Sequence, residues 1–185
     1  VCGARWAART GVCERCEVLD VAGMGGAGAI SVGRSKGAHK AGPDGGDGGH
    51  GGSVYVRAEA NLATLLDYRD RSEWKADRGQ HGKGKTKTGS SAEDLYLPVP
   101  PGTIIRDLST DSIVGEALQA GDTILVAKGG RGGRGNARFT SSTHQSPREW
   151  EPGEDSQESQ SELVRKLSAA CRRVGAPNAG TSPAP

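Results

Sequence analysis

Aromatic side chains are scarce in this sequence, whose 185 residues include three tryptophans, three tyrosines and one phenylalanine. Hydrophobic residues of all kinds make up only 34% of the chain. No apolar run approaches the roughly 20 residues that a membrane-spanning helix needs. The composition therefore predicts one small hydrophobic core with tails, and no membrane partner.

Cysteine is also rare, and the spacing of the four cysteines predicts no disulfide scaffold, so a reducing compartment is the default. Cys13 and Cys16 have a CxxC spacing, but a zinc site needs about two further ligands and no second pair follows. We therefore expect no metal site. The four histidines are scattered, without a cysteine or acid arranged as in a nucleophilic site, so we expect no catalytic residue.

Glycine, in contrast, is abundant: of 30 glycines, thirteen lie in residues 23–52 and five in residues 129–135. In both tracts glycine recurs at every third position in two registers. A period of three is that of the polyproline II helix, and bare glycine faces let neighbouring backbones approach closely. The tracts therefore predict packed polyproline II helices. The alternative is a flexible linker, against which stand the strict phase and the absence of serine padding.

Short strand candidates surround the tracts, with turn-forming residues between several of them, and predict a small β-barrel or sandwich. Residues 100–102 and 119–122 predict turns, and Pro98 and Pro100 should lie at a sheet edge or a strand end. Residues 69–91 are polar and basic and predict a long loop or loop pair. Residues 160–173 predict a short helix. The strand candidates are residues 16–21, 53–57, 94–99, 103–106, 112–114 and 122–127.

Charge is unevenly distributed, although the formal net charge is only +2. Residues 69–88 hold seven Lys or Arg against three acids, and residues 128–148 hold five Lys or Arg and no acid. Residues 149–162 then hold six acids and no base. This order predicts a surface with a cationic end.

Two long motifs, Gly42-Pro-Asp-Gly-Gly-Asp-Gly-Gly49 and Lys128-Gly-Gly-Arg-Gly-Gly-Arg-Gly-Asn-Ala-Arg-Phe139, resemble the signature of the Obg GTPase family. Residues 61–66, 139–143 and 151–154 resemble it too, in the expected order. The resemblance implies a mainly β Obg fold with little α-helix, in which a bundle of glycine-rich polyproline II helices projects from a small β-barrel. We expect a leader or disordered tail over residues 1–15, the Obg domain over 16–157, and the start of a GTPase domain over 158–185.

The same resemblance implies a function in assembly of the large ribosomal subunit, with GTP and Mg²⁺ as the cofactors of full-length family members. Residues 175–180 resemble the first part of a phosphate-binding loop, but the lysine that should follow is absent. We therefore expect this chain as written to hydrolyse no GTP and to hold no cofactor. The alternatives are a complete GTP-hydrolysing protein of which this is a part, and a glycine-rich scaffold without an RNA partner. The incomplete nucleotide site consists of Gly175, Asn178, Gly180 and Ser182.

Ribosomal RNA offers a high density of phosphate, so Lys and Arg on projecting loops should supply most of the affinity. Trp74 and His81 are candidates for stacking on unpaired bases. The alternative for each basic residue is a solvated loop charge. The candidate RNA-binding residues are Arg34, Lys36 and Lys40 in one loop, and Arg69, Arg71, Trp74, Lys75, Arg78, Lys83, Lys85 and Lys87 in another.

Three arginines of the second glycine tract have a different expected role. We expect Arg131, Arg134 and Arg138 to pair with Asp44 and Asp47 and so to lock the bundle, with direct RNA contact as the alternative.

The start of the chain is arginine-rich and acid-poor, which is typical of an organelle transit peptide but also fits a disordered tail. Both interpretations stay open, so the expected location is the cytoplasm or an organelle, either a mitochondrion or a chloroplast. The expected partners are the large ribosomal subunit and its rRNA, and we expect a monomer.

Overall fold

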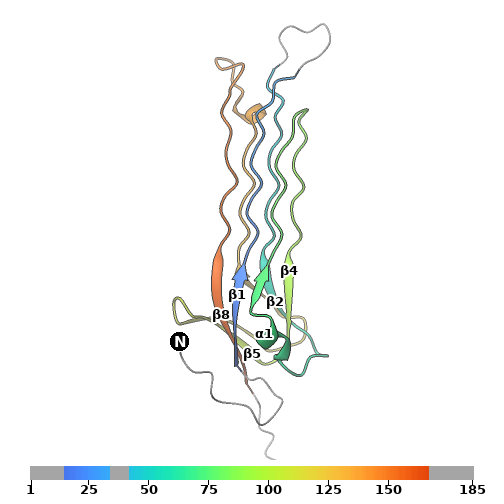
Figure 1. The fold of residues 1–185 in the computed structure, drawn as a ribbon, viewed down its shortest axis with the longest axis vertical. Helices are drawn as coiled ribbons and strands as arrows, with labels where there is room; N and C mark the ends of the chain where they lie inside the picture. The colour runs from blue at the N-terminus through green and yellow to red at the C-terminus, as the bar shows by residue number, and fades with distance from the viewer. Residues whose placement is uncertain (1–14, 34–41, 167–185) are drawn as a thin grey trace, which may run out of the picture.

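The computed structural model of the chain describes residues 15–33 and 42–166, in which a bundle of extended segments rises from a small β-domain (Figure 1). The mainly β class expected from the sequence is confirmed. Within the described residues, no helix has the length and hydropathy to cross a bilayer. The strands are β1 (Arg15–Val21), β2 (Val54–Ala58), β3 (Glu73–Lys75), β4 (Leu95–Val99), β5 (Thr103–Asp107), β6 (Ser112–Ala117), β7 (Thr123–Ala127) and β8 (Glu158–Arg165), and the helices are α1 (Leu66–Asp70) and the 3-10 helix η1 (Asn136–Phe139).

The β-domain consists of two sheets around one core. A five-stranded sheet has the order β3-β1-β8-β5-β6, and a three-stranded sheet has the order β4-β2-β7. Alternation along the strands sends Val54 and Val56 of β2, Leu97 of β4 and Ile105 of β5 into the core, where each is fully buried. Pro98 lies in β4 at the edge of its sheet, where a missing amide hydrogen is tolerated.

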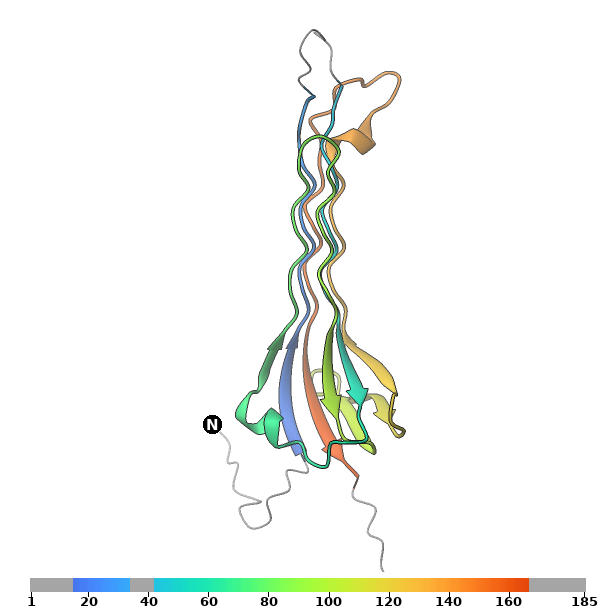
Figure 2. The same cartoon turned by 90° about the vertical axis from the view of Figure 1, so that its right-hand side faces the viewer.

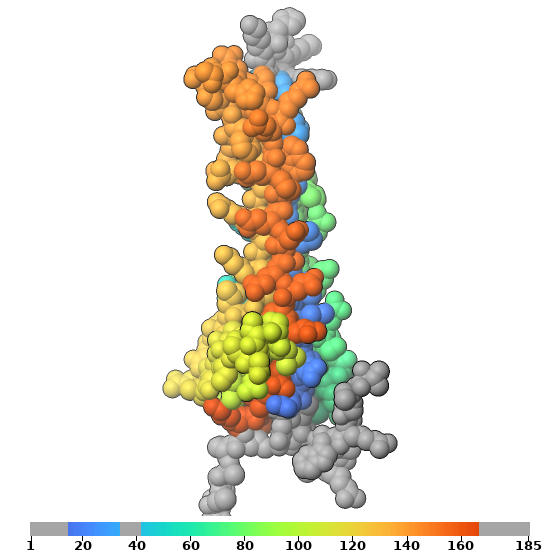
Figure 3. Space-filling model, turned by 90° about the vertical axis from the view of Figure 1, so that its left-hand side faces the viewer, coloured from blue at the N-terminus to red at the C-terminus, as the bar shows by residue number. Residues whose placement is uncertain are grey.

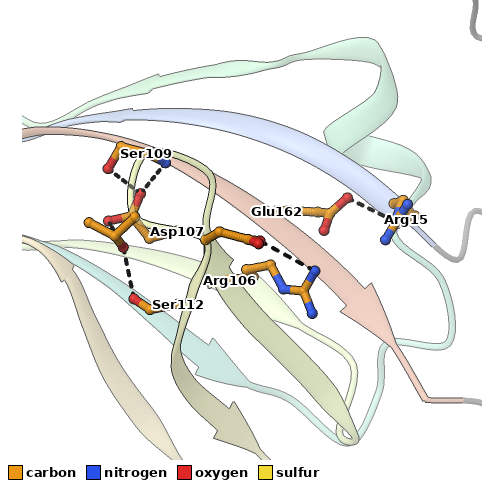
Figure 4. A network of polar contacts seen from close by, with 8 residues as sticks. Arg15, Arg106, Asp107, Ser109, Ser112 and Glu162 are labelled. Carbon is orange, nitrogen blue, oxygen red and sulfur yellow. Dashed lines mark hydrogen bonds and ion pairs between the residues drawn. The ribbon is translucent and has the colours of Figure 1, made fainter.

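The short loop between β5 and β6 is held by polar contacts at the surface of the β-domain (Figure 4). Asp107 Oδ1 accepts hydrogen bonds from both the backbone N–H and the hydroxyl of Ser109, which lower the pKa of Asp107. On the neighbouring strands, Arg15 Nε lies 2.7 Å from Glu162 Oε1. The first set of contacts orders the β5–β6 loop beside Gln160 of β8, and the second lies near the end of the β-domain that is remote from the shaft.

One carboxylate in the core lacks a hydrogen-bond partner among the described residues. Asp20 of β1 is fully buried, and both of its side-chain oxygens are unpaired. Burial raises the pKa of Asp20 to about 6, while the nearby Ser161 hydroxyl has a smaller, lowering effect. Ser161 makes no hydrogen bond of ordinary geometry to the carboxylate, so desolvation dominates.

Above the β-domain, extended segments form a narrow shaft that is visible in two further views (Figures 2 and 3). Backbone hydrogen bonds join neighbouring segments at every third residue, as in Gly23 N–H to Gly52 O, Gly26 N–H to Gly49 O and Ala29 N–H to Gly46 O. The described parts of the glycine tracts are therefore packed together and joined by backbone hydrogen bonds, and the flexible-linker alternative is wrong. The shaft comprises residues 22–33, 42–53, 76–82, 88–94, 128–135 and 150–157.

The close packing of the shaft requires glycine. A Cβ atom built on Gly48 would lie 1.9 Å from the carbonyl oxygen of Gly26, and one on Gly51 would lie 1.9 Å from that of Gly23. No side chain fits such a gap without moving a backbone. Position 42, by contrast, has no atom of a described residue within 4 Å of the equivalent point.

The structure contradicts two predictions of secondary structure. Residues 160–165 are not helical: they belong to β8, which pairs with β1 on one side and β5 on the other. The β-domain therefore includes residues 158–165, which we expected to belong to the start of a GTPase domain. Residues 69–91 are not one long loop, because α1 and β3 lie in the β-domain and only the rest of the segment runs up the shaft and back.

Candidate nucleic-acid interface

The shaft carries a lysine-rich hairpin turn at residues 83–87, at the end of the segment remote from the β-domain (Figure 2). Lys83 and Lys87 pair across the turn, with Lys83 N–H donating to Lys87 O at 2.9 Å. The side chains of Lys83, Lys85 and Lys87 are exposed. Three cations are thus gathered on one short turn, which we call the tip hairpin.

The backbone of the tip hairpin adopts an unusual conformation. Lys85 and Thr86 have φ angles of 61° and 53°, in the left-handed region that non-glycine residues rarely occupy. Asp44 of the neighbouring segment holds the turn, because its carbonyl accepts Thr86 N–H at 2.7 Å and its Oδ2 accepts Lys85 N–H at 3.3 Å. Such strain is often kept where a loop has to present a functional group.

Arg78 and His81 lie on the arm leading to the tip hairpin, beside an open depression of about 460 Å³ lined by residues 78–83. His81 Nδ1 accepts the backbone N–H of Ala27 at 3.0 Å, and Arg78 Nη2 lies 2.6 Å from His81 Nε2. The imidazole is thus held against the shaft through Nδ1, while its ring remains exposed.

The structure separates the other candidates of the second loop from the tip hairpin. Trp74 lies in β3 of the β-domain, where its ring is 5.6 Å from that of Tyr68 and 4.3 Å from the Arg71 guanidinium. Its indole N–H donates to Arg71 O. Trp74 is therefore half-buried and in contact with both Tyr68 and Arg71, away from the tip hairpin. Arg69 and Lys75 also lie in the β-domain, in α1 and β3.

The arginines of the second glycine tract form only one of the ion pairs expected for them. Arg138 Nε lies 2.6 Å from Asp47 Oδ2, whereas Arg134 pairs with Glu151 at 3.8 Å. Asp44 holds the tip hairpin, and its buried Oδ1 has no hydrogen-bond partner among residues 15–33 and 42–166. No ion pair to Arg131 occurs within the described part of the chain.

The side chains at the non-glycine positions of the first tract bond to the second tract. Asp47 Oδ1 accepts the N–H of Gly135 at 2.9 Å, His50 Nδ1 accepts that of Gly132 at 3.2 Å, and Ser53 Oγ accepts that of Gly129 at 3.2 Å. The non-glycine positions of the triplets therefore supply acceptors for amides of an antiparallel neighbour. The period of three therefore places hydrogen-bonding side chains as well as closely packed glycines at regular positions.

Asn136 closes the upper part of the shaft and did not stand out in the sequence. It is fully buried; its Oδ1 accepts Gly45 N–H at 2.8 Å, and its Nδ2 donates to Ser31 O at 2.9 Å and Pro147 O at 3.3 Å. One amide thereby joins three segments. The only signal for it was its position immediately after the last glycine of the second tract.

Several predicted site residues lie outside the described residues. These are the first-loop cations Arg34, Lys36 and Lys40, and the incomplete nucleotide site of Gly175, Asn178, Gly180 and Ser182. Within residues 15–33 and 42–166, no group of three or more His, Cys, Asp or Glu side chains is placed to hold a metal ion.

The structure thus defines a class of protein with two parts. A β-domain of two sheets carries a projecting shaft of hydrogen-bonded glycine tracts, and the shaft bears a cationic tip hairpin. Residues 13–167 match the family model described as GTP1/OBG. The chain belongs to the GTP1/OBG family.

Similar curated proteins carry the name GTPase Obg. That of Chloroherpeton thalassium is 49% identical over 169 residues, which cover 91% of this chain and 51% of the relative. Those of Chlorobium chlorochromatii and Moorella thermoacetica are 46% and 48% identical over 169 residues, covering 50% and 40% of their lengths. The chain thus spans about half the length, or less, of these relatives.

Proposed function

We propose that this chain is the ribosome-binding part of an Obg-type GTPase that acts in assembly of the large ribosomal subunit. In this proposal the shaft carries the tip hairpin into the subunit, and exposed cations contact rRNA phosphates. The single observation that supports it most strongly is the grouping of Lys83, Lys85 and Lys87 on one turn held away from the β-domain.

Rigidity is the second support for the proposal. A flexible lysine loop loses conformational entropy on binding, whereas a loop already ordered has lost it on folding. Asp44 fixes the backbone of the tip hairpin at two amides, and triplet hydrogen bonds fix the shaft below it. We further propose that the shaft segments are polyproline II helices, which accounts for the period of three.

The proposal separates the predicted cations into two groups. Arg78, Lys83, Lys85 and Lys87 lie on the shaft or its tip hairpin and are proposed to contact RNA, together with Arg34, Lys36 and Lys40 of the preceding loop. Arg69, Arg71 and Lys75, together with the neutral Trp74, lie in the β-domain, and we propose no RNA contact for them.

Co-sedimentation of the chain with purified large ribosomal subunits across a salt series tests the proposal. Neutralising the tip hairpin with Lys83→Gln, Lys85→Gln and Lys87→Gln should weaken binding and lower the slope of log affinity against log salt by about two. A matched control neutralises Arg57, Arg69 and Lys75 of the β-domain and should leave the slope unchanged.

Binding at low salt that weakens steeply as salt rises supports RNA contact. No co-sedimentation of the unaltered chain even at low salt contradicts the proposal and favours a scaffold without an RNA partner. Equal losses from the tip and control variants would contradict the assignment of the interface to the tip hairpin.

A further inference from the structure

A polar groove of about 270 Å³ lies along the flank of the shaft, between residues 47–50, residues 88–91 and the second glycine tract. The three arginines of that tract, Arg131, Arg134 and Arg138, all line it. We call it the flank groove. None of its lining residues belongs to the tip hairpin at residues 83–87.

The flank groove keeps an excess of positive charge after its ion pairs are counted. Asp47 is its one acidic lining residue and is engaged by Arg138 at 2.6 Å. Arg134 meets Glu151 only at 3.8 Å, with both side chains about half exposed, so this pair is weak. Arg131 has no side-chain ion pair with a described residue, although its backbone N–H donates to Glu154 Oε2 at 3.4 Å. The guanidinium of Arg131 and the weakly paired guanidinium of Arg134 can therefore receive an anion.

Hydrogen-bond donors also predominate in the flank groove. His50 Nδ1 accepts the N–H of Gly132 at 3.2 Å, so the proton of the neutral ring resides on Nε2, which becomes a donor. The guanidinium groups can only donate, and Thr88 adds an exposed hydroxyl. A ligand rich in acceptors and carrying negative charge is what such a surface recognises.

The backbone of the flank groove lies open to a bulky ligand because glycine supplies much of its lining. Gly48, Gly49 and Gly89 line it without side chains. Among the described residues, no Phe, Tyr or Trp lines it, and its one imidazole, that of His50, is bonded through Nδ1 to the N–H of Gly132. The contacts therefore favour the sugar-phosphate backbone over the bases, and sequence is not read.

We propose that the flank groove binds the phosphodiester backbone of an RNA strand that runs along the shaft. The inference rests on the proposed function and deepens it, since the RNA contact extends from the tip hairpin down one side of the bundle. Arg131 and Arg134 are the phosphate-binding residues, and His50 and Thr88 assist them. Arg138 also retains its pair with Asp47.

The test uses the full chain and a fluorescently labelled single-stranded oligouridylate, with fluorescence anisotropy measured across a KCl series. The groove variant combines Arg131→Gln with Arg134→Gln. It should bind about tenfold more weakly at low salt, with a salt slope lower by about 1.4, since each phosphate contact to a single strand contributes about 0.7. Thr88→Glu, which removes no arginine, should weaken binding in the same direction.

The matched control combines Arg57→Gln with Arg69→Gln in the β-domain, which changes net charge equally. Thermal unfolding of all variants checks that the fold is kept. Unchanged oligonucleotide affinity in both the groove variant and Thr88→Glu would overturn the inference, as would an equal loss in the control. A groove that binds inorganic phosphate but not the oligonucleotide would overturn it too.

Parallel co-sedimentation with large ribosomal subunits distinguishes the two proposals. Subunit binding that depends on the tip lysines but not on the groove arginines rejects the flank groove and keeps the proposed function. If the unaltered chain does not bind subunits but the groove variant loses oligonucleotide affinity, the ribosomal function is rejected and the groove stands as an RNA site. If the chain binds neither probe, both are rejected.

Discussion

Asn136 Oδ1 accepts the backbone N–H of Gly45 at 2.8 Å across 91 residues of sequence. The same side chain donates to the carbonyl of Ser31 and to that of Pro147, and all of these contacts are buried or partly buried. A small amide thus connects three segments where the shaft meets η1. Its removal leaves the buried N–H of Gly45 and the carbonyls of Ser31 and Pro147 without this partner.

We therefore expect Asn136→Ala to lower the free energy of unfolding by about 3 kcal/mol, because a buried amide and two carbonyls lose their partner. Thermal and denaturant unfolding measure the change. Thr140→Ala, which removes an exposed hydroxyl bonded to the Ala137 carbonyl, is the control and should cost less than about 0.5 kcal/mol. A loss as small as that of the control would show that Asn136 does not hold the segments together.

Gly48→Ala should destabilise the shaft by about 3 kcal/mol or more, because the added methyl would lie 1.9 Å from the carbonyl oxygen of Gly26. Gly42→Ala provides the comparison, since no atom of the described part of the chain lies within 4 Å of its Cβ position. Unfolding midpoints of the two variants should differ by several degrees. Similar midpoints would mean that the segments separate at little cost and that the period of three is not a packing requirement.

The tip hairpin gives a prediction in which stability and binding change independently. Thr86→Gly relieves a β-branched residue at φ 53° and should raise the free energy of unfolding by about 1 kcal/mol with subunit binding retained. Lys85→Gly relieves φ 61° to a similar extent but also removes a cation, so it should stabilise the chain and weaken binding. Loss of binding in both variants would assign the effect to backbone geometry instead of charge.

Asp20 makes stability depend on pH. Its pKa is raised from 3.8 to about 6 in the fold, so the neutral carboxyl is favoured there. The contribution of Asp20 is fully present below pH 3.8 and is lost as pH rises through about 6, amounting to about 3 kcal/mol. Asp20→Asn should match the unaltered chain near pH 3.5 and exceed it in stability by about this amount at pH 7.5. Parallel unfolding curves of the two proteins at every pH would contradict the assignment.

The sequence predicts the β-domain strands well where local signals are strong. Tyr55 and Arg57 alternate with buried Val54 and Val56, so β2 is visible as a period of two. β8 was missed because its first five residues, Glu-Ser-Gln-Ser-Glu, lack β-branched and aromatic side chains, although it lies between β1 and β5. Its position is determined by partners far away in the sequence, which no local pattern reveals.

The candidate site was only partly predictable for a similar reason. The lysines of the tip hairpin are evident as a charge cluster, but the sequence gives no sign that α1 and β3 return Arg69 and Trp74 to the β-domain. The pairing of Arg134 with Glu151 instead of an aspartate depends on the antiparallel register of residues 128–134 and 151–157. Glycine periodicity predicts that segments pack closely but not which segments become neighbours.

Arg15 lies opposite Val164 in the β1–β8 pair, so the described chain enters and leaves the β-domain side by side, at the end opposite the tip hairpin (Figure 2). Hydrogen bonds at every third residue join the segments of the shaft, so the shaft is expected to move as one rigid unit. A force applied at its far end would therefore arrive at the base as a torque. A group joined to the chain at that base would respond to the orientation of the shaft. The length of the shaft would still separate this group from whatever the tip hairpin contacts.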